Sequence, residues 1–147
     1  MNNLSFHITD ITANSIRANA SEIGLSIEEQ DARIVIRITD NGSGMDAETA
    51  RRVTNPFYTT RTTRKVGLGL PFLIQNAEQT GGSVSLTSEP GKGTEVRAVF
   101  HSDHIDCPPW GDLPGTVALL ITGNPEINVC YCQRIPFGRN RGVNLSL

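Results

Sequence analysis

Two consecutive stretches of alternating apolar and polar residues do most to limit how this chain can fold. Every second position is isoleucine or leucine: Ile23, Leu25 and Ile27 in residues 22–28, and Ile34, Ile36 and Ile38 in residues 32–39. A period of two places these side chains on one face of an extended backbone, so both stretches are predicted to be half-buried strands. The polar segment Glu29-Gln30-Asp31 lies between them and favours an antiparallel hairpin.

The second stretch leads directly into an acidic, glycine-rich turn, Asp40-Asn41-Gly42-Ser43-Gly44-Met45. The carboxylate of Asp40 is predicted to lie at the end of its strand. Gly42 and Gly44 can adopt positive φ and allow a ligand to approach the backbone closely. Because many strands end in such a turn, the turn alone does not indicate a function.

The remaining elements are predicted from periodicity and from residues that start or stop helices. Helices are expected over residues 3–19, from the N-cap Asp46 to Val53, over 67–80 and over 113–122. Strands are expected over residues 83–88, 94–101 and 127–135, and residues 143–147 are a candidate for a last strand. Residues 54–66 form an irregular segment that is basic and rich in hydroxyl groups.

Composition limits the setting and the partners of the chain. Its 147 residues are enough for one domain with a real core. The net charge of −2 and the pI of about 5.9 give no reason to expect nucleic-acid binding. No apolar run approaches the roughly 20 residues that a membrane span needs. Three cysteines, an odd number, favour a reducing cytoplasmic setting over a disulfide framework.

Four segments occur in an order that resembles the GHKL ATPases, which include sensor histidine kinases, gyrase-type topoisomerases, and mismatch-repair and chaperone ATPases. They are the helix with Asp10, Asn14 and Arg17, the strand end Asp40-x-Gly42-x-Gly44, the turn Gly67-Leu68-Gly69-Leu70, and Gly91-Lys92-Gly93-Thr94. Residues 53–100 look most like the histidine-kinase branch, since residues 55–61 resemble its phenylalanine box and residues 67–70 its second glycine box. Residues 13–20 look closer to the mismatch-repair ATPases. The resemblance covers about residues 5–100.

The resemblance implies an α+β fold, the Bergerat ATP-binding fold. This is a two-layer α/β sandwich in which helices cover one face of a mixed, mainly antiparallel sheet. We expect residues 1–102 to form the ATP-binding domain and residues 103–147 to be a C-terminal extension, a helix plus one or more strands, packed on the same domain. The strand over 127–135 is a candidate to join the sheet edge, and a partner-docking role is the alternative.

The resemblance also implies which residues hold adenine. Asp40 would accept a charge-assisted hydrogen bond from the exocyclic amino group of the base. Thr94 would support that carboxylate and a bridging water. Gly42 and Gly44 would let the backbone pass close to the base, and Met45 would pack against it.

Phosphate and Mg²⁺ would be held on the other side of the site. The turn Gly67-Leu68-Gly69-Leu70 opens a helix and so offers free N–H groups and a positive dipole end. Arg17 stands at a basic position that touches phosphate in the family, and Arg61 and Lys65 are further phosphate candidates. Asn14 would supply an amide oxygen to Mg²⁺, a hard cation that prefers oxygen ligands.

One residue and one segment depart from the family pattern. Asp10 is the catalytic candidate, because it stands where the family usually has a glutamate that polarises the attacking water or acceptor. Aspartate is one methylene shorter, and a displacement of about 1 Å can cost about 10²-fold in rate. The lid between Phe57 and Gly67 is short, which predicts weak ATP binding and fast exchange.

Histidine and cysteine residues outside these motifs offer weaker alternatives. His7 could be a phosphoacceptor, but no Arg-Thr-Pro-type segment follows it, so we interpret it as structural. Cys130 and Cys132 would share one face of a strand, as core residues do. Together with Cys107 they do not have a standard zinc spacing, and no metal site is predicted there.

The leading functional hypothesis is an Mg-ATP-binding, histidine-kinase-like domain that acts as a stand-alone kinase or regulatory module on a partner protein. One alternative is a non-catalytic nucleotide sensor or adaptor, in the manner of anti-sigma proteins. Another is a slow ATP hydrolase of the mismatch-repair type, which would form a homodimer with ATP. Whether the chain is an enzyme stays open at this point.

Overall fold

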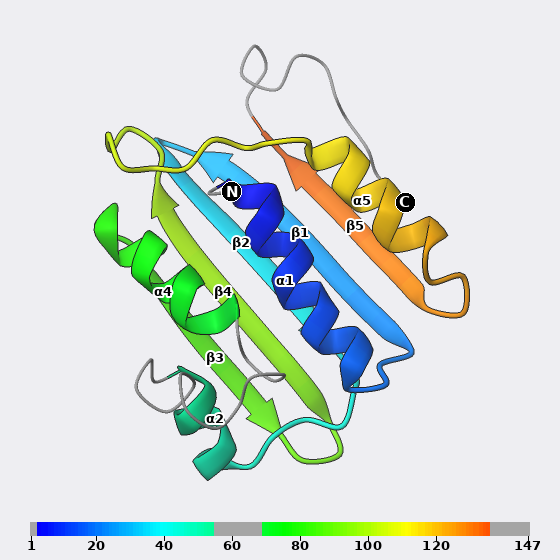
Figure 1. Ribbon diagram of the computed structural model, residues 1–147. Helices are drawn as coiled ribbons and strands as arrows, with labels where there is room; N and C mark the ends of the chain where they lie inside the picture. Colours follow the sequence, from blue (N-terminus) through cyan, green and yellow to red (C-terminus); the bar gives the residue numbers. More distant parts are fainter. Residues whose placement is uncertain (1–2, 55–68, 136–147) are drawn as a thin grey trace.

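Five strands form one sheet in the order β3-β4-β2-β1-β5 (Figure 1). The computed structural model describes residues 3–54 and 69–135. β1 pairs in parallel with β5, and the other neighbours pair antiparallel. The strands are β1 (Glu22–Gln30), β2 (Arg33–Asp40), β3 (Ser83–Glu89), β4 (Gly93–His101) and β5 (Asn128–Arg134).

The helices gather on one face of this sheet, with α1 across its middle and α4 and α5 on either side (Figure 1). Their bounds are α1 (Leu4–Arg17), α2 (Ala47–Thr54), α4 (Gly69–Gln79) and α5 (Leu113–Thr122). In the part of the chain that is described, no helix covers the opposite face. The predicted two-layer α+β sandwich with a mixed, mainly antiparallel sheet is therefore confirmed.

The hairpin between β1 and β2 turns later than predicted. Glu29 and Gln30 belong to β1, and the turn consists of Asp31 and Ala32, with φ of 55° and 59°. Two central residues with positive φ form the kind of turn whose twist matches that of antiparallel strands. The predicted turn at residues 29–31 is thus displaced, and Glu29 lies buried in the sheet.

The core lies between the helices and the sheet. Leu4, Ile8 and Ile11 recur at three- and four-residue steps and form the buried stripe of α1. They meet the alternating apolar residues of β1, β2 and β4, and a second stripe from α4. Partners that are at most 2% exposed include Leu25, Ile27, Ile34, Ala77 and Phe100.

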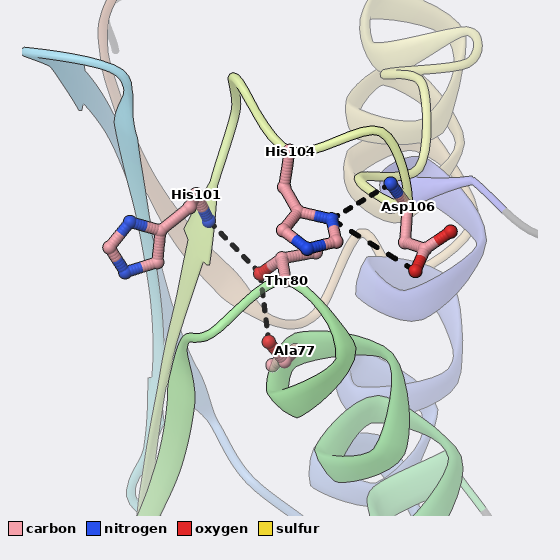
Figure 2. A network of polar contacts seen from close by, with 5 residues as sticks. All are labelled: Ala77, Thr80, His101, His104 and Asp106. Carbon is pink, nitrogen blue, oxygen red and sulfur yellow. Dashed lines mark hydrogen bonds and ion pairs between the residues drawn. The ribbon is translucent and has the colours of Figure 1, made fainter.

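The far end of α4 is tied to the end of β4 through Thr80, as Figure 2 shows. The Thr80 hydroxyl donates to the carbonyl of Ala77 at 2.8 Å and accepts the backbone N–H of His101 at 3.0 Å. In the following loop, Nδ1 of His104 accepts the backbone N–H of Asp106 at 3.0 Å. The helix therefore has a fixed end on the sheet, away from its first residue, Gly69.

The segment after β4 crosses to the other side of α1. The backbone N–H of Leu4 donates to the carbonyl of Pro109 at 2.8 Å, and the Ser5 hydroxyl donates to that of Trp110 at 2.6 Å. α5 then packs against α1, and β5 lies beside β1. The candidate strand over 143–147 lies outside the described residues. Within the described ranges, no helix has the length and apolar character needed to cross a membrane.

Candidate functional site

A cavity of about 280 Å³ lies where the C-terminal part of α1 passes over the end of β2 and the start of β4. The acidic turn after β2 forms one wall. α1 contributes Asn14, Ser15 and Arg17, and the start of α4 contributes Leu70. The cavity follows from the fold, because β2 ends at Asp40 and the chain turns away there while the helix continues above it.

Asp40 presents its carboxylate to this cavity and is fixed by two donors. The Ser15 hydroxyl donates to Oδ2 at 2.6 Å, and the backbone N–H of Gly42 donates to Oδ1 at 2.9 Å. A carboxylate has about four lone-pair positions, so it can accept further hydrogen bonds. The geometry therefore leaves Asp40 able to bind a donor group of a ligand in the cavity.

A hydroxyl pair lies beside Asp40 on the next strands. Thr94 is the β4 partner of Asp40, and its hydroxyl lies 2.7 Å from that of Ser88 in β3. The Ser88 hydroxyl also accepts the backbone N–H of Met45 at 2.8 Å. Met45 and Thr94 both line the cavity, so Ser88 connects two walls of the site.

The glycines of the acidic turn are required by close packing. Gly44 has φ +73°, and a Cβ there would lie 1.9 Å from the carbonyl oxygen of Glu89. At Gly42 a Cβ would lie 2.7 Å from the carbonyl oxygen of Ala18. The turn is also held by a backbone hydrogen bond of 2.7 Å from Gly91 to Ser43. It is therefore locked between α1 and the β3–β4 hairpin.

Asn14 and Arg17 lie one turn apart on α1 at the cavity wall. The guanidinium group of Arg17 donates to the amide oxygen of Asn14. Mg²⁺ takes one or two protein oxygens and completes its shell with phosphate and water. The Asn14 amide oxygen fits that donor set once Arg17 has turned towards a phosphate.

Asp10 lies half-buried at the edge of the cavity region, beside the first residue of α4. A Cβ on Gly69 would lie 2.7 Å from the Cβ of Asp10 and 3.2 Å from its Oδ2. Burial raises the pKa of Asp10 above its ordinary value, and the charge of Arg17 partly opposes this shift. Asp10 therefore borders the start of α4, while Asn14 and Arg17 line the cavity.

The predicted site residues fall into three groups. The cavity brings together Asn14, Arg17, Asp40, Gly44, Met45, Leu70 and Thr94. Gly42 packs against Ala18 at the end of α1, and Gly69 packs against Asp10. Arg61, Lys65, Gly67 and Leu68 lie outside the described residues.

Sequence reasoning missed two hydroxyl groups, Ser15 and Ser88. Ser15 continues the buried stripe of α1 four residues after Ile11, where the helical pattern alone indicates only a small residue that packs in the core. Ser88 occupies an inward position of β3, after Val84 and Leu86. In both cases the available signal was a hydroxyl at a position where the pattern expects an apolar side chain.

His7 lies three residues before Asp10 but belongs to the core. It is 1% exposed, its ring lies 5.2 Å from that of Phe72, and its Nε2 lies 2.8 Å from Nδ2 of Asn76. Burial lowers the pKa of His7 to about 4. The ring is therefore neutral at neutral pH, with Nε2 as the acceptor for the Asn76 amide.

Comparison with known proteins agrees with this geometry. The family model described as histidine kinase-, DNA gyrase B- and HSP90-like ATPase matches residues 3–104. The sensor histidine kinase YxdK of Bacillus subtilis is 28% identical over 104 residues, which is 66% of this chain and 32% of that protein. Sporulation kinase C of Bacillus subtilis is 30% identical over 101 residues, 67% of this chain and 23% of that kinase.

The sensor kinase CckA of Brucella abortus is 34% identical over 91 residues, 61% of this chain and 10% of that kinase. The matched part is thus about a third or less of each of these three relatives. The similarity to these kinases concerns one domain of longer proteins.

Proposed function

Because this chain belongs to the histidine kinase-, DNA gyrase B- and HSP90-like ATPase family and is a histidine-kinase-like ATP-binding domain, we propose that it binds Mg-ATP in the cavity above Asp40 and acts on a partner protein. In this proposal it works as a kinase or regulatory module. The partner is either a phosphoacceptor or a protein whose activity changes with nucleotide occupancy.

The observation that carries the proposal is the fixed carboxylate of Asp40. Ser15 and the Gly42 backbone orient it, and Thr94 stands beside it on the next strand. A carboxylate so placed is suited to accept the exocyclic amino group of adenine. The apolar surroundings of Ile38, Met45 and Val96 suit the faces of the base.

The contact between Asn14 and Arg17 supports the assignment of the phosphate end. Arg17 is exposed, so its guanidinium group can turn to an incoming phosphate. That movement would release the Asn14 amide oxygen, which could then bind Mg²⁺. The two residues would thus change partners together when Mg-ATP enters.

ATP titration of the wild type and of Asp40→Asn by isothermal calorimetry tests the proposal. A charge-assisted hydrogen bond contributes about 1.5–3 kcal/mol, so we expect ATP affinity to fall by about 10- to 100-fold. Asp103→Asn, an exposed carboxylate in the loop after β4, is the matched control and should bind as the wild type does. Equal affinity in all three proteins would show that the adenine assignment is wrong.

The position of Asp10 favours one second candidate, a nucleotide sensor that does not transfer phosphate. Asp10 is shorter than the family's usual glutamate, and it borders Gly69 outside the set of cavity-lining residues. Incubation with γ-labelled ATP and candidate partners separates the two functions. Label on a partner that Asp10→Asn abolishes would support a kinase, and ATP binding without transfer or hydrolysis would support a sensor.

Phosphate release without any partner, together with ATP-dependent homodimers, would instead indicate the slow hydrolase. A reducing, cytoplasmic setting belongs to the same proposal. It is supported by Cys107, Cys130 and Cys132, none of which forms a disulfide in the described part of the chain. The negative net charge supports a protein rather than a nucleic acid as the macromolecular partner.

A further inference from the structure

Cys130 and Cys132 lie on the sheet face opposite the helices, on the strand at the sheet edge. Their neighbours Tyr131 and Gln133 point into the buried side, whereas both cysteines are exposed and free. Successive side chains of a strand point to opposite faces. The interpretation of the two cysteines as core residues is therefore wrong, although they do share one face.

The strand next to them leaves space above the two thiols. In the β1–β5 pairing, Cys130 stands opposite Gly24 and Cys132 stands opposite Ser26. Gly24 has no side chain and Ser26 has a small one. No bulky group of β1 therefore separates the two sulfur atoms or covers them.

The distance between Cys130 and Cys132 along the strand decides whether a disulfide or a metal ion can join their two sulfur atoms. Residues two apart in a strand have Cβ atoms about 6.7 Å apart. A disulfide needs Cβ atoms within about 4.5 Å, so it would require bending of the strand. A metal bound linearly by two sulfurs, with bonds of about 2.3 Å as in zinc–sulfur sites, needs the sulfurs about 4.6 Å apart. Two thiols leaning towards each other can meet that distance.

We propose that Cys130 and Cys132 form a two-thiolate site for a soft monovalent cation, with Cu(I) as the ion that fits best. Thiolate ligands select soft metals. In the described ranges, no group of three or more histidine, cysteine or carboxylate side chains could hold a metal, which argues against tetrahedral Zn²⁺ here. Binding deprotonates both thiols, forms two S–Cu bonds and releases two protons, without any change of oxidation state.

Anaerobic titration with Cu(I), in competition with a chromophoric Cu(I) chelator, tests this site. We expect one Cu(I) per monomeric chain in the wild type. Cys130→Ser and Cys132→Ser should each weaken binding at least 100-fold, because one thiolate remains. Cys107→Ser is the matched control, since Cys107 lies in the connection before α5, and it should bind Cu(I) as the wild type does.

Circular dichroism and ATP titration of the same variants show whether each is folded. Unchanged Cu(I) affinity in Cys130→Ser or Cys132→Ser would overturn the proposal, as would loss of binding in Cys107→Ser. One Cu(I) shared by two chains would also overturn it, because the site would then lie between molecules. The proposal does not depend on the nucleotide function, so failure of one leaves the other unaffected.

Discussion

The hydroxyl of Ser15 shows how one side chain can decide the geometry of the cavity. It reaches from α1 to Oδ2 of Asp40 and so fixes the carboxylate from the helix side. Without it, Asp40 would keep only the backbone donor of Gly42. The orientation of the carboxylate therefore depends on the helix as well as on its own turn.

Ser15→Ala should weaken ATP binding about 5- to 10-fold, or about 1–1.4 kcal/mol. Asp40 loses one of the two donors that orient it, and we expect only part of the energy of that hydrogen bond to be transmitted to ATP binding. Calorimetric titration with ATP measures this change. Ser26→Ala, on the opposite face of the sheet, is the control with the same atoms removed. If both variants bind ATP like the wild type, Ser15 does not position Asp40.

His7 predicts how stability depends on pH. Burial lowers its pKa to about 4 in the folded chain, from the ordinary value of 6.5 that an unburied histidine has. Below pH 6.5 the unfolded chain therefore binds a proton that the folded chain excludes, so stability falls as the pH falls towards 4. Between pH 7 and pH 5 we expect a loss of about 2 kcal/mol from His7.

Urea unfolding of wild type and His7→Gln at pH 7 and pH 5 measures this contribution. Glutamine keeps an acceptor for Asn76 but does not titrate, so the pH dependence should become flatter by about 2 kcal/mol. The raised pKa of Asp10 acts in the opposite direction, since it adds stability as the pH falls. The difference between the two proteins isolates His7, and parallel curves would contradict its role.

At the scale of elements, the acidic turn between β2 and α2 is limited by backbone contact as well as by its dihedral angles. Gly44 and Gly91 have similar φ values, +73° and +77°. A Cβ at Gly44 would meet the Glu89 carbonyl at 1.9 Å, whereas a Cβ at Gly91 would meet nothing within 4 Å. Substitutions at these two glycines can therefore be compared to separate the cost of a strained backbone from the cost of a steric clash.

Gly91→Ala should destabilise the fold by about 1–2 kcal/mol, the cost of a left-handed conformation with a side chain. Gly44→Ala should cost about 1–3 kcal/mol more, because the backbone must also shift. It should weaken ATP binding as well, since the turn forms a wall of the cavity. Thermal and urea unfolding measure both variants, and equal destabilisation would show that the contact with Glu89 is not limiting.

The sequence was sufficient for elements whose pattern is local. Alternation predicted β1 and β2, and the helix expected over 113–122 is α5, which the structure shows to be capped by Asp112. The hairpin turn was misplaced because Asp31 and Ala32 adopt positive φ, which side chains other than glycine rarely do. The turn preferences of the residue types therefore favour the polar residues 29–31 as the turn.

The candidate site was predicted only in part for a related reason. Asp40 and its glycines could be recognised because they are adjacent in sequence. The contact of Ser15 with Asp40 depends on how α1 crosses the sheet, and the contact of Arg17 with Asn14 depends on a rotamer. The first is not encoded in a local pattern of residues, whereas for the second the three-residue spacing already makes Asn14 and Arg17 neighbours on α1.

At the scale of the whole molecule, the segment after residue 102 shares the core of the nucleotide-binding part. Tyr131 of β5 is 2% exposed and belongs to the same cluster as Leu4 and Ile8 of α1. We therefore expect residues 1–102 and 103–147 to unfold together as one cooperative unit.

Tyr131→Ala should lower the free energy of unfolding by about 3–5 kcal/mol, because a large buried side chain is removed. The transition should stay single, with fluorescence of Trp110 and far-ultraviolet circular dichroism giving the same midpoint. Two separate transitions would show that residues 103–147 form an independent unit.

The parallel pairing of β1 with β5 also bears on the order in which the chain acquires its structure. Glu22 near the start pairs with Asn128 near the end, while β1–β2 and β3–β4 are hairpins between neighbours in sequence. Pairings between distant residues form slowly because a long loop must close first. During synthesis the strands that frame Asp40 can therefore assemble before β5 leaves the ribosome. Of the five strands that are described, we expect β5 to join last, at the edge of a sheet that has already formed.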